Sequence, residues 1–268
     1  MMNNQSVNAK VEIQKYLNNL PKKENISVLW AVESGSRAWG FPSPDSDYDV
    51  RGIYIYPQDE YLKIFSPQES IEFISNQWFD VGLWDIRKVG KLLQKSNAVI
   101  FEWFNSPIIY HQDNFFAQNF AKILNYYFNP QAVIYHYRGI AKSAMAQMNI
   151  QHFDLSELNN HSYKLKKFFY LLRSLLAADF VLKEQKIPPI VIFDLMKNHS
   201  LEIQEEIKNL IDIKSCQDEK YTQNIPTILW QFVIELWENI CDFSCQNYEL
   251  SDIALADDFF KKLLNNFA

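Results

Sequence analysis

The chain has 268 residues, 48% of them apolar and 15% aromatic, which is enough to bury a core in one large or two modest domains. Its net charge of −6 and the lack of a dense Lys/Arg run argue against tight nonspecific binding of nucleic acid. No apolar run approaches the length of a membrane span, and the polar start MMNNQSVNAKVEIQ lacks a signal peptide's apolar centre, so we expect a soluble, cytoplasmic protein without a membrane partner.

The first part of the chain mixes helix and strand patterns. Runs of apolar and β-branched residues predict buried strands, and three- and four-residue apolar spacing predicts helices. The expected helices are residues 11–20 and 86–96, and the expected strands are residues 26–33, 48–56 and 79–84. These elements predict an N-terminal α/β module.

From about Asn114 the pattern changes to long helical periods. The expected helices are residues 114–128, 130–148, 156–185 and 225–243. Pro130 is placed to begin one of them, and Pro188 and Pro189 to end another. We therefore expect an α/β domain of residues 1–112 and an all-helical domain of residues 113–268, with a cleft between them as the natural nucleotide site.

A dense motif, GSRAWGFPSPDSDYDVR, occupies residues 35–51 between two expected strands. Gly35 lets the backbone approach a ligand closely, while the Ser36 hydroxyl and the amides that follow, including that of Arg37, can donate to phosphate. Asp47 and Asp49, two positions apart on a strand, are expected on one face, with Tyr48 and Val50 on the other. Two such carboxylates repel each other unless a cation lies between them, and Mg²⁺ prefers carboxylates together with phosphate oxygens.

Each part of the motif also has a plainer interpretation. Pro44, Asp45 and Ser46 are ordinary turn formers, and a Gly-Ser pair alone is weak evidence of function. The combination is more specific. A Gly-Ser pair, ten intervening residues and then Asp-Tyr-Asp between apolar strands resembles the signature of the DNA polymerase β-like nucleotidyltransferase superfamily.

The resemblance extends well beyond the motif, over residues 33 to about 190. ESGSRAWGFPSPDSDYDVRGIYI, DVGLWDIRKVGKLL, NAVIFEWFNSPIIY and KKFFYLLRSLLAADFV are similar to the predicted nucleotidyltransferase family called YcgL or RlaP, some of whose members are associated with RNA repair. This resemblance implies a polymerase-β-like α/β (α+β) module with a mixed sheet, followed by an all-α C-terminal domain.

In the superfamily a third carboxylate comes from a neighbouring strand, and this chain offers two candidates. Asp80 lies inside the strand-like run FDVGLW, whereas Asp85 falls where a helix N-cap belongs, directly before IRKVGKLLQ. The two positions differ by an odd number, so they cannot share a face of one regular strand. We assign Asp80 to the site and Asp85 to the cap.

The resemblance implies two metal ions, Mg²⁺ or Mn²⁺, that activate an attacking hydroxyl and brace the α-phosphate of an NTP, expected to be ATP, for displacement of pyrophosphate. Asp47 and Asp49 would hold both ions, and Asp80 would bind the metal beside the acceptor hydroxyl and could help to deprotonate it. Arg51, on the face of Asp49, would either balance the carboxylates or touch phosphate; a structural salt bridge is an equally good interpretation.

Further nucleotide-binding candidates lie on helices. Lys166, Tyr170 and Arg173 are spaced to form one stripe of a helix, and superfamily relatives often place a Lys and a Tyr from such a helix on the nucleotide. Lys88 in the family-like DIRK is another candidate. Without the resemblance, a solvated helix face would be the better interpretation of these charges.

Three functions are compatible with these residues. The first is metal-dependent transfer of NMP from an NTP to a hydroxyl with release of pyrophosphate, with RNA (repair or tRNA end processing, at a tRNA or an RNA 3′ end) as the expected acceptor. The second is nucleotidylylation of a protein, as by antitoxins of the superfamily, which are typically shorter and lack a large helical domain. The third is a catalytically silent nucleotide-binding regulator, which a damaged carboxylate set would mark; Asp47, Asp49 and Asp80 are all present. A small-molecule acceptor and the oligomeric state stay open.

Overall fold

A computed structural model describes residues 4–74, 78–243 and 250–267, and the side chains from residue 9 onward. The chain divides into two compact units. The first, here called the sheet unit, contains residues 1–35, 47–127 and 250–268. The second, the helical unit, contains residues 36–46 and 128–249.

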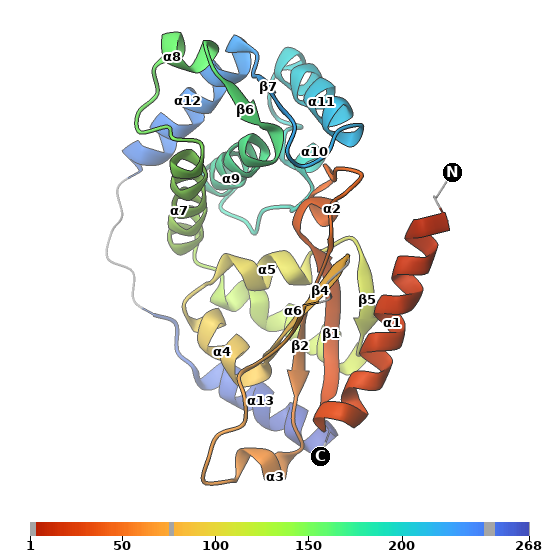
Figure 1. Ribbon diagram of the computed structural model, residues 1–268. Helices are drawn as coiled ribbons and strands as arrows, with labels where there is room; N and C mark the ends of the chain where they lie inside the picture. Colours follow the sequence, from red (N-terminus) through yellow and green to blue (C-terminus); the bar gives the residue numbers. More distant parts are fainter. Residues whose placement is uncertain (1–3, 75–77, 244–249, 268) are drawn as a thin grey trace. The chain divides into compact units, whose positions relative to one another are not determined.

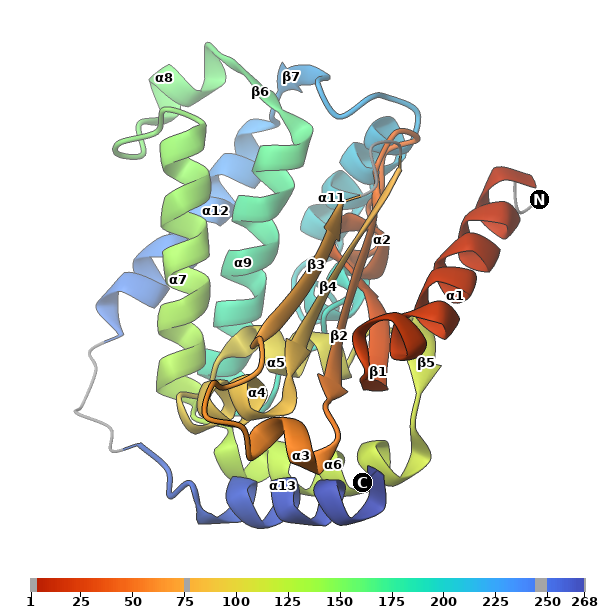
Figure 2. The ribbon, with the colours of Figure 1, turned by 60° about the horizontal axis from the view of Figure 1, so that its bottom comes forward.

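The sheet unit is built on five strands in the order β3-β4-β2-β1-β5 (Figure 1; β3 is labelled in Figure 2). β2 pairs parallel with β4, and the other neighbours are antiparallel, so the sheet is mixed as expected. The strands are β1 (Ser27–Ser34), β2 (Tyr48–Ile55), β3 (Ser70–Ile74), β4 (Phe79–Asp85) and β5 (Ile109–Gln112).

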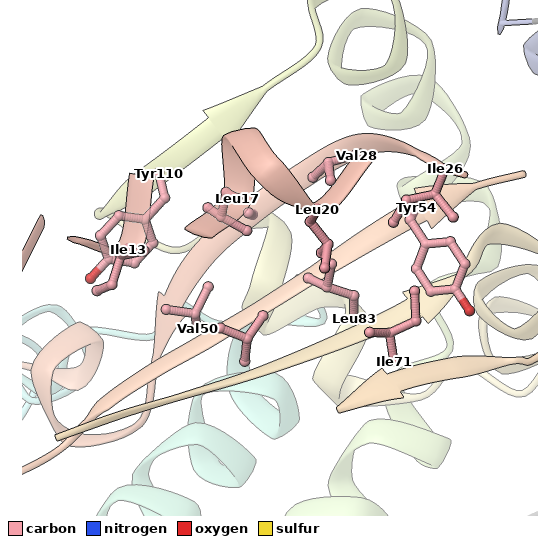
Figure 3. Packing of buried hydrophobic residues seen from close by; sticks show 12 residues of the cluster. Ile13, Leu17, Leu20, Ile26, Val28, Val50, Tyr54, Ile71, Leu83 and Tyr110 are labelled. Atoms are coloured by element: carbon pink, nitrogen blue, oxygen red, sulfur yellow. The ribbon is translucent and has the colours of Figure 1, made fainter. Parts of the chain in front are cut away.

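One face of this sheet is covered by α1 (Asn4–Glu24). Figure 3 shows Ile13, Leu17 and Leu20 of this helix over the side chains of the strands. The alternation of β2 places Val50 and Tyr54 in this cluster, both with 0% exposure. The same alternation turns Asp49 and Arg51 to the opposite face.

The opposite face of the sheet carries α4 (Ile86–Gln94), α5 (Ala98–Phe104) and α6 (Asn114–Tyr127) (Figure 1). The last helix of the chain, α13 (Ala254–Phe267), returns to pack on α4 and α6, beside which it runs in Figure 2. A short helix, α3 (Gln58–Tyr61), follows β2. The sheet unit therefore depends on residues from both ends of the sequence.

The helical unit is organised around α9 (Leu165–Glu184), which packs on helices from both sides of it in the sequence. Buried residues on every side of α9 make it the centre of this unit. The surrounding elements are α7 (Pro130–Gln147), α8 (Leu155–Asn159), α10 (Ile192–Leu195), α11 (Leu201–Ser215), α12 (Thr227–Asp242) and a two-stranded sheet of β6 (Ser162–Lys164) and β7 (Thr222–Asn224). The C-terminal region is thus mostly helical, as expected, with one small sheet.

Two expectations about the elements need correction. The single helix expected over residues 156–185 is interrupted by β6, because Tyr163 pairs with Gln223 of β7. The turn expected after the first strand is a short helix, α2 (Gly35–Trp39). Pro130 does begin α7, with the Asn129 side chain accepting a hydrogen bond from Ala132 N–H at 3.1 Å.

The division into domains 1–112 and 113–268 stays a prediction. Three segments of the chain belong to a different compact unit from the domain in which that boundary would place them. Residues 36–46 pack with the helical unit, whereas residues 113–127 and 250–268 pack with the sheet unit. The chain therefore passes between the units four times.

Candidate active site

Asp49 and Asp80 are brought together by the parallel pairing of β2 and β4. Their Cα atoms are partners in the ladder, so both side chains point to the same face of the sheet. This is the face opposite the α1 core, and the two side chains keep 35% and 37% exposure. The two carboxylates therefore form an accessible acidic pair on neighbouring strands.

Asp47 lies one residue before this ladder. β2 begins at Tyr48, whereas the spacing predicted that Asp47 and Asp49 share one regular strand. Asp47 is exposed and directly precedes the strand. Tyr48 and Val50 do turn to the α1 core, as expected.

Arg51 bridges Asp49 and Asp80. Its guanidinium donates to Asp49 Oδ1 at 3.0 Å and to Asp80 Oδ1 at 2.7 Å and Oδ2 at 3.2 Å. Burial lowers the pKa of Arg51, but its hydrogen bond to Asp80 and the charges of Asp80, Asp49 and Glu33 outweigh burial and leave the pKa above its ordinary value. The arginine thus supplies a permanent positive charge to the acidic pair.

Gly35 approaches the same pair from the end of β1. Its φ is +65°, in the left-handed region, and a Cβ at this position would lie 2.3 Å from Asp49 Oδ2. A side chain there would have to displace the carboxylate or the turn. The Gly-Ser motif and the Asp-x-Asp motif therefore meet where Gly35 approaches Asp49, fourteen positions further along the chain.

Glu33, which the sequence interpretation did not single out, supports Asp49 from the other face of the sheet. Glu33 pairs with Val50, so its side chain points away from the face of Asp49. It has 1% exposure, accepts from the Asp49 backbone N–H at 2.9 Å and from the Tyr110 hydroxyl, and so has partners for both oxygens. An acidic residue at the end of the apolar run ISVLWAVE was the signal available in the sequence.

Asp85 is the N-cap of α4, as predicted. Its Oδ1 accepts from Arg87 N–H at 2.9 Å, and its Oδ2 accepts from the Tyr61 hydroxyl at 2.6 Å. The residue has 0% exposure and lies on the same side of β4 as Val81 and Leu83, opposite Asp80. Lys88, in the first turn of α4, places its ammonium 4.6 Å from the centre of the Trp84 ring.

The remaining nucleotide-binding candidates lie in the helical unit. Arg37 donates to the Ser46 carbonyl at 2.5 Å, and the Ser36 hydroxyl donates to Ser46 Oγ at 3.3 Å. On α9, Lys166 pairs with Glu219 at 2.5 Å. Because Glu219 also accepts from the Ser46 hydroxyl at 3.1 Å, these contacts connect the loop 36–46 with α9.

Tyr170 and Arg173 both contact Trp39 in the same loop. The Tyr170 ring meets the Trp39 ring edge-on at 5.0 Å, and the Arg173 guanidinium lies 4.3 Å from the ring centre. Arg173 has only 3% exposure and donates to the Ile190 carbonyl at 2.9 Å. The predicted stripe therefore faces the loop that follows Gly35, and Arg173 contributes to packing beneath it.

The donor chemistry at Asp49 and Asp80 fits a hard divalent cation. Both are accessible carboxylates held close enough to share one cationic partner, and oxygen ligands of this kind suit Mg²⁺. Among the residues that the structure describes, no group of three or more His, Cys, Asp or Glu side chains is arranged to hold a metal ion. The three-carboxylate set of Asp47, Asp49 and Asp80 stays a prediction, in which Asp47 would have to join the pair.

A mixed sheet with a glycine that opens a short helix after one strand and acidic side chains on two adjacent strands defines a polymerase-β-like, nucleotidyltransferase-like fold. The chain belongs to the RlaP family, described as the RNA repair pathway DNA polymerase beta family, whose profile matches residues 9–261. It is 34% identical over 220 residues to the uncharacterized protein YcgL of Bacillus subtilis (strain 168), covering 81% of each chain. A crystal structure of a nucleotidyltransferase-like protein from Exiguobacterium sibiricum 255-15 aligns with a TM-score of 0.35 and 10% identity, over 95% of this chain and 80% of that one.

In the described part of the chain, no helix is both long and apolar enough to cross a membrane.

Proposed function

We propose that this protein is a metal-dependent nucleotidyltransferase that moves NMP from an NTP to a hydroxyl group, with an RNA end as the acceptor. The observation that carries the proposal is the contact of Gly35 with Asp49, which stands in register with Asp80. This close approach brings the Gly-Ser segment, which would bind phosphate in the proposal, to the acidic pair. The family description, which refers to an RNA repair pathway, supports RNA as the acceptor.

Asp49 and Asp80, with Asp47, would hold Mg²⁺ or Mn²⁺, which when bound lowers the pKa of the attacking hydroxyl and stabilises charge on the α-phosphate. In this proposal Asp80 accepts the proton of the acceptor hydroxyl. The amides that follow Ser36 would donate to the triphosphate, and so would the Ser36 hydroxyl once its proton turns away from Ser46. Arg51 keeps the two carboxylates together by its charge.

The net charge of the chain shapes the expected mode of RNA binding. At −6, the protein offers little general attraction for a polyanion. We therefore propose recognition of an RNA end through few phosphate contacts. ATP is the expected nucleotide, and lysines on α9, Lys166 among them, are candidates for contact with the triphosphate.

The test is incubation of the protein with each α-labelled NTP, Mg²⁺ or Mn²⁺, and total cellular RNA, followed by denaturing gels before and after RNase. We expect label in an RNase-sensitive band with one NTP, and a loss of at least about 100-fold in Asp49→Asn and in Asp80→Asn. The matched control is Asp59→Asn, which changes an exposed aspartate of the sheet unit. It should retain wild-type labelling.

Other outcomes of the same gels would replace the proposal. Label that survives RNase but is lost to protease would identify protein nucleotidylylation. Label in neither band, although NTP binds, would indicate a nucleotide-binding regulator or a small-molecule acceptor. Full labelling by Asp80→Asn would remove Asp80 from the site.

A further inference from the structure

The loop of residues 36–46 is closed on itself by hydrogen bonds at its base. Ser46 Oγ accepts from the Ser36 hydroxyl at 3.3 Å and from the Ser43 backbone N–H at 3.0 Å. Phe41 N–H donates to the Ser36 carbonyl at 3.0 Å. Ser46, with 5% exposure, thus sets the position of the Ser36 hydroxyl.

Glu219, in the segment between α11 and β7, contacts the last two residues of this loop, Asp45 and Ser46. Its Oε1 accepts from the Ser46 hydroxyl at 3.1 Å, and its backbone N–H donates to the Asp45 carboxylate at 3.0 and 3.2 Å. Its Oε2 accepts from Lys166 Nζ at 2.5 Å. One residue therefore connects the loop with α9 through three separate hydrogen-bonded groups.

The direction of these hydrogen bonds makes Glu219 the terminal acceptor of a chain. The Ser36 hydroxyl donates to Ser46, and the Ser46 hydroxyl donates to Glu219. The Glu219 carboxylate can accept from Ser46 and from Lys166 at the same time, because it has two oxygens and no proton to donate. The hydrogen bonds within such a chain polarise one another. When every donor and acceptor has a partner, they fix a single arrangement of the side chains.

A second anchor lies beneath the same loop. Lys214 on α11 has 1% exposure, and its Nζ donates to Ser43 Oγ at 2.7 Å. Burial lowers the pKa of Lys214 to about 8. The loop is therefore held on two sides by charged residues that lie more than 160 positions away in the sequence.

We propose that Glu219 is a positioning residue for nucleotide binding, which fixes the loop of residues 36–46 through Ser46 and the Lys166 ammonium directly. The inference rests on the proposed function, in which the amides that follow Ser36 and the Lys166 ammonium contact the triphosphate. Glu219 itself does not touch the nucleotide. Its substitution raises the KM for NTP while kcat stays within about threefold.

The variants are Glu219→Ala, Glu219→Gln and Ser46→Ala, with Glu205→Ala as the matched control, since Glu205 is an exposed glutamate on α11. Gln keeps an oxygen that can accept from Ser46 but loses the charge that pairs with Lys166. We expect Glu219→Ala to weaken NTP binding about tenfold and Glu219→Gln about threefold. Ser46→Ala should add little to Glu219→Ala, because both break one chain.

Two measurements separate positioning from the proposed function. Hydrogen exchange reports the amides of residues 36–46, and calorimetry reports the binding of each NTP with Mg²⁺. Faster exchange in the loop of Glu219→Ala, with unchanged exchange in α12 and weaker NTP binding, supports the proposal. Unchanged exchange in the loop, or faster exchange with wild-type NTP affinity, overturns the positioning role alone. Wild-type protein that binds no NTP overturns the proposed function, and the positioning role with it.

Discussion

Gly35 is the point at which a single added carbon would disturb the acidic pair. Its positive φ disfavours any L side chain by roughly 1–2 kcal/mol, and the Cβ would lie 2.3 Å from Asp49 Oδ2. We expect Gly35→Ala to reduce nucleotidyl transfer at least about 100-fold, since small displacements of a catalytic group have effects of this size. Labelled-NTP transfer and thermal unfolding measure the two effects.

Gly139→Ala is the matched control for that substitution. Gly139 lies within α7, and a Cβ there has no atom within 4 Å. Alanine in a helix interior should stabilise the protein by about 0.5–1 kcal/mol. Transfer by Gly35→Ala at the wild-type rate would show that Asp49 does not need the space that the glycine leaves.

Arg51 is the counter-ion of the acidic pair, and its removal should make the pair more responsive to metal. Without the guanidinium, Asp49 and Asp80 repel each other across adjacent strands. We expect Arg51→Gln to lower the unfolding temperature in chelator and to regain more of it on addition of Mg²⁺ than the wild type gains. Calorimetric scans over a Mg²⁺ series measure this difference.

The double variant Asp49→Asn/Arg51→Gln provides the control, because it removes the repulsion together with the counter-ion. Its unfolding temperature should respond to Mg²⁺ less than that of Arg51→Gln. An equal response of wild type and Arg51→Gln would show that Mg²⁺ does not bind at these two carboxylates.

At the scale of elements, the two aspartates of β4 point to opposite faces of the sheet and have different roles. Asp85 caps α4 and accepts a hydrogen bond from the Tyr61 hydroxyl, whereas Asp80 pairs with Arg51. We expect Asp85→Asn to lower the unfolding free energy by about 1 kcal/mol or more, since the cap and the bond from Tyr61 are both weakened. Asp80→Asn should leave stability nearly unchanged and abolish transfer.

Urea unfolding together with labelled-NTP transfer separates the two roles. A stable Asp85→Asn protein without transfer activity would reverse the assignment. Activity that falls only in proportion to the folded fraction would agree with it.

Local signals explain which elements were predictable. The cap at Asp85 could be predicted because an aspartate stands directly before an amphipathic run, and the strands β1 and β2 because apolar runs flank the motif. The break before α9 could not be predicted in this way. Tyr163 is held in β6 by a partner 60 positions away, Gln223, and no nearby residue signals that pairing.

The candidate site shows the same division. The spacing of Gly35, Asp47 and Asp49 is visible in the sequence itself. Strand alternation predicted the face of Asp80, whereas Asp47 precedes β2 instead of lying within it. The chain from Ser36 through Ser46 to Glu219 could not, because a lone glutamate in a polar segment carries no pattern. Such contacts depend on tertiary packing.

At the scale of the whole molecule, the sheet unit takes residues from both sides of the predicted boundary near residue 112. α6 and α13 complete the sheet unit, where Phe116 and Phe120 of α6 pack against Phe259 of α13 at 5.9 Å between ring centres. A fragment of residues 1–112 would expose the surface that these helices cover. We expect such a fragment to show no cooperative unfolding in urea.

A point substitution tests the same dependence in the full chain. Phe259 has 6% exposure, so Phe259→Ala should lower the unfolding free energy by about 3–5 kcal/mol, whereas Phe65→Ala, at 86% exposure in the same unit, should change it by less than about 0.5 kcal/mol. Cooperative folding of residues 1–112, together with a small effect of Phe259→Ala, would show that the N-terminal domain is complete without α6 and α13. If residues 1–112 do not fold cooperatively and Phe259→Ala has a large effect, the stability of the sheet that carries the acidic pair on β2 and β4 depends on α13.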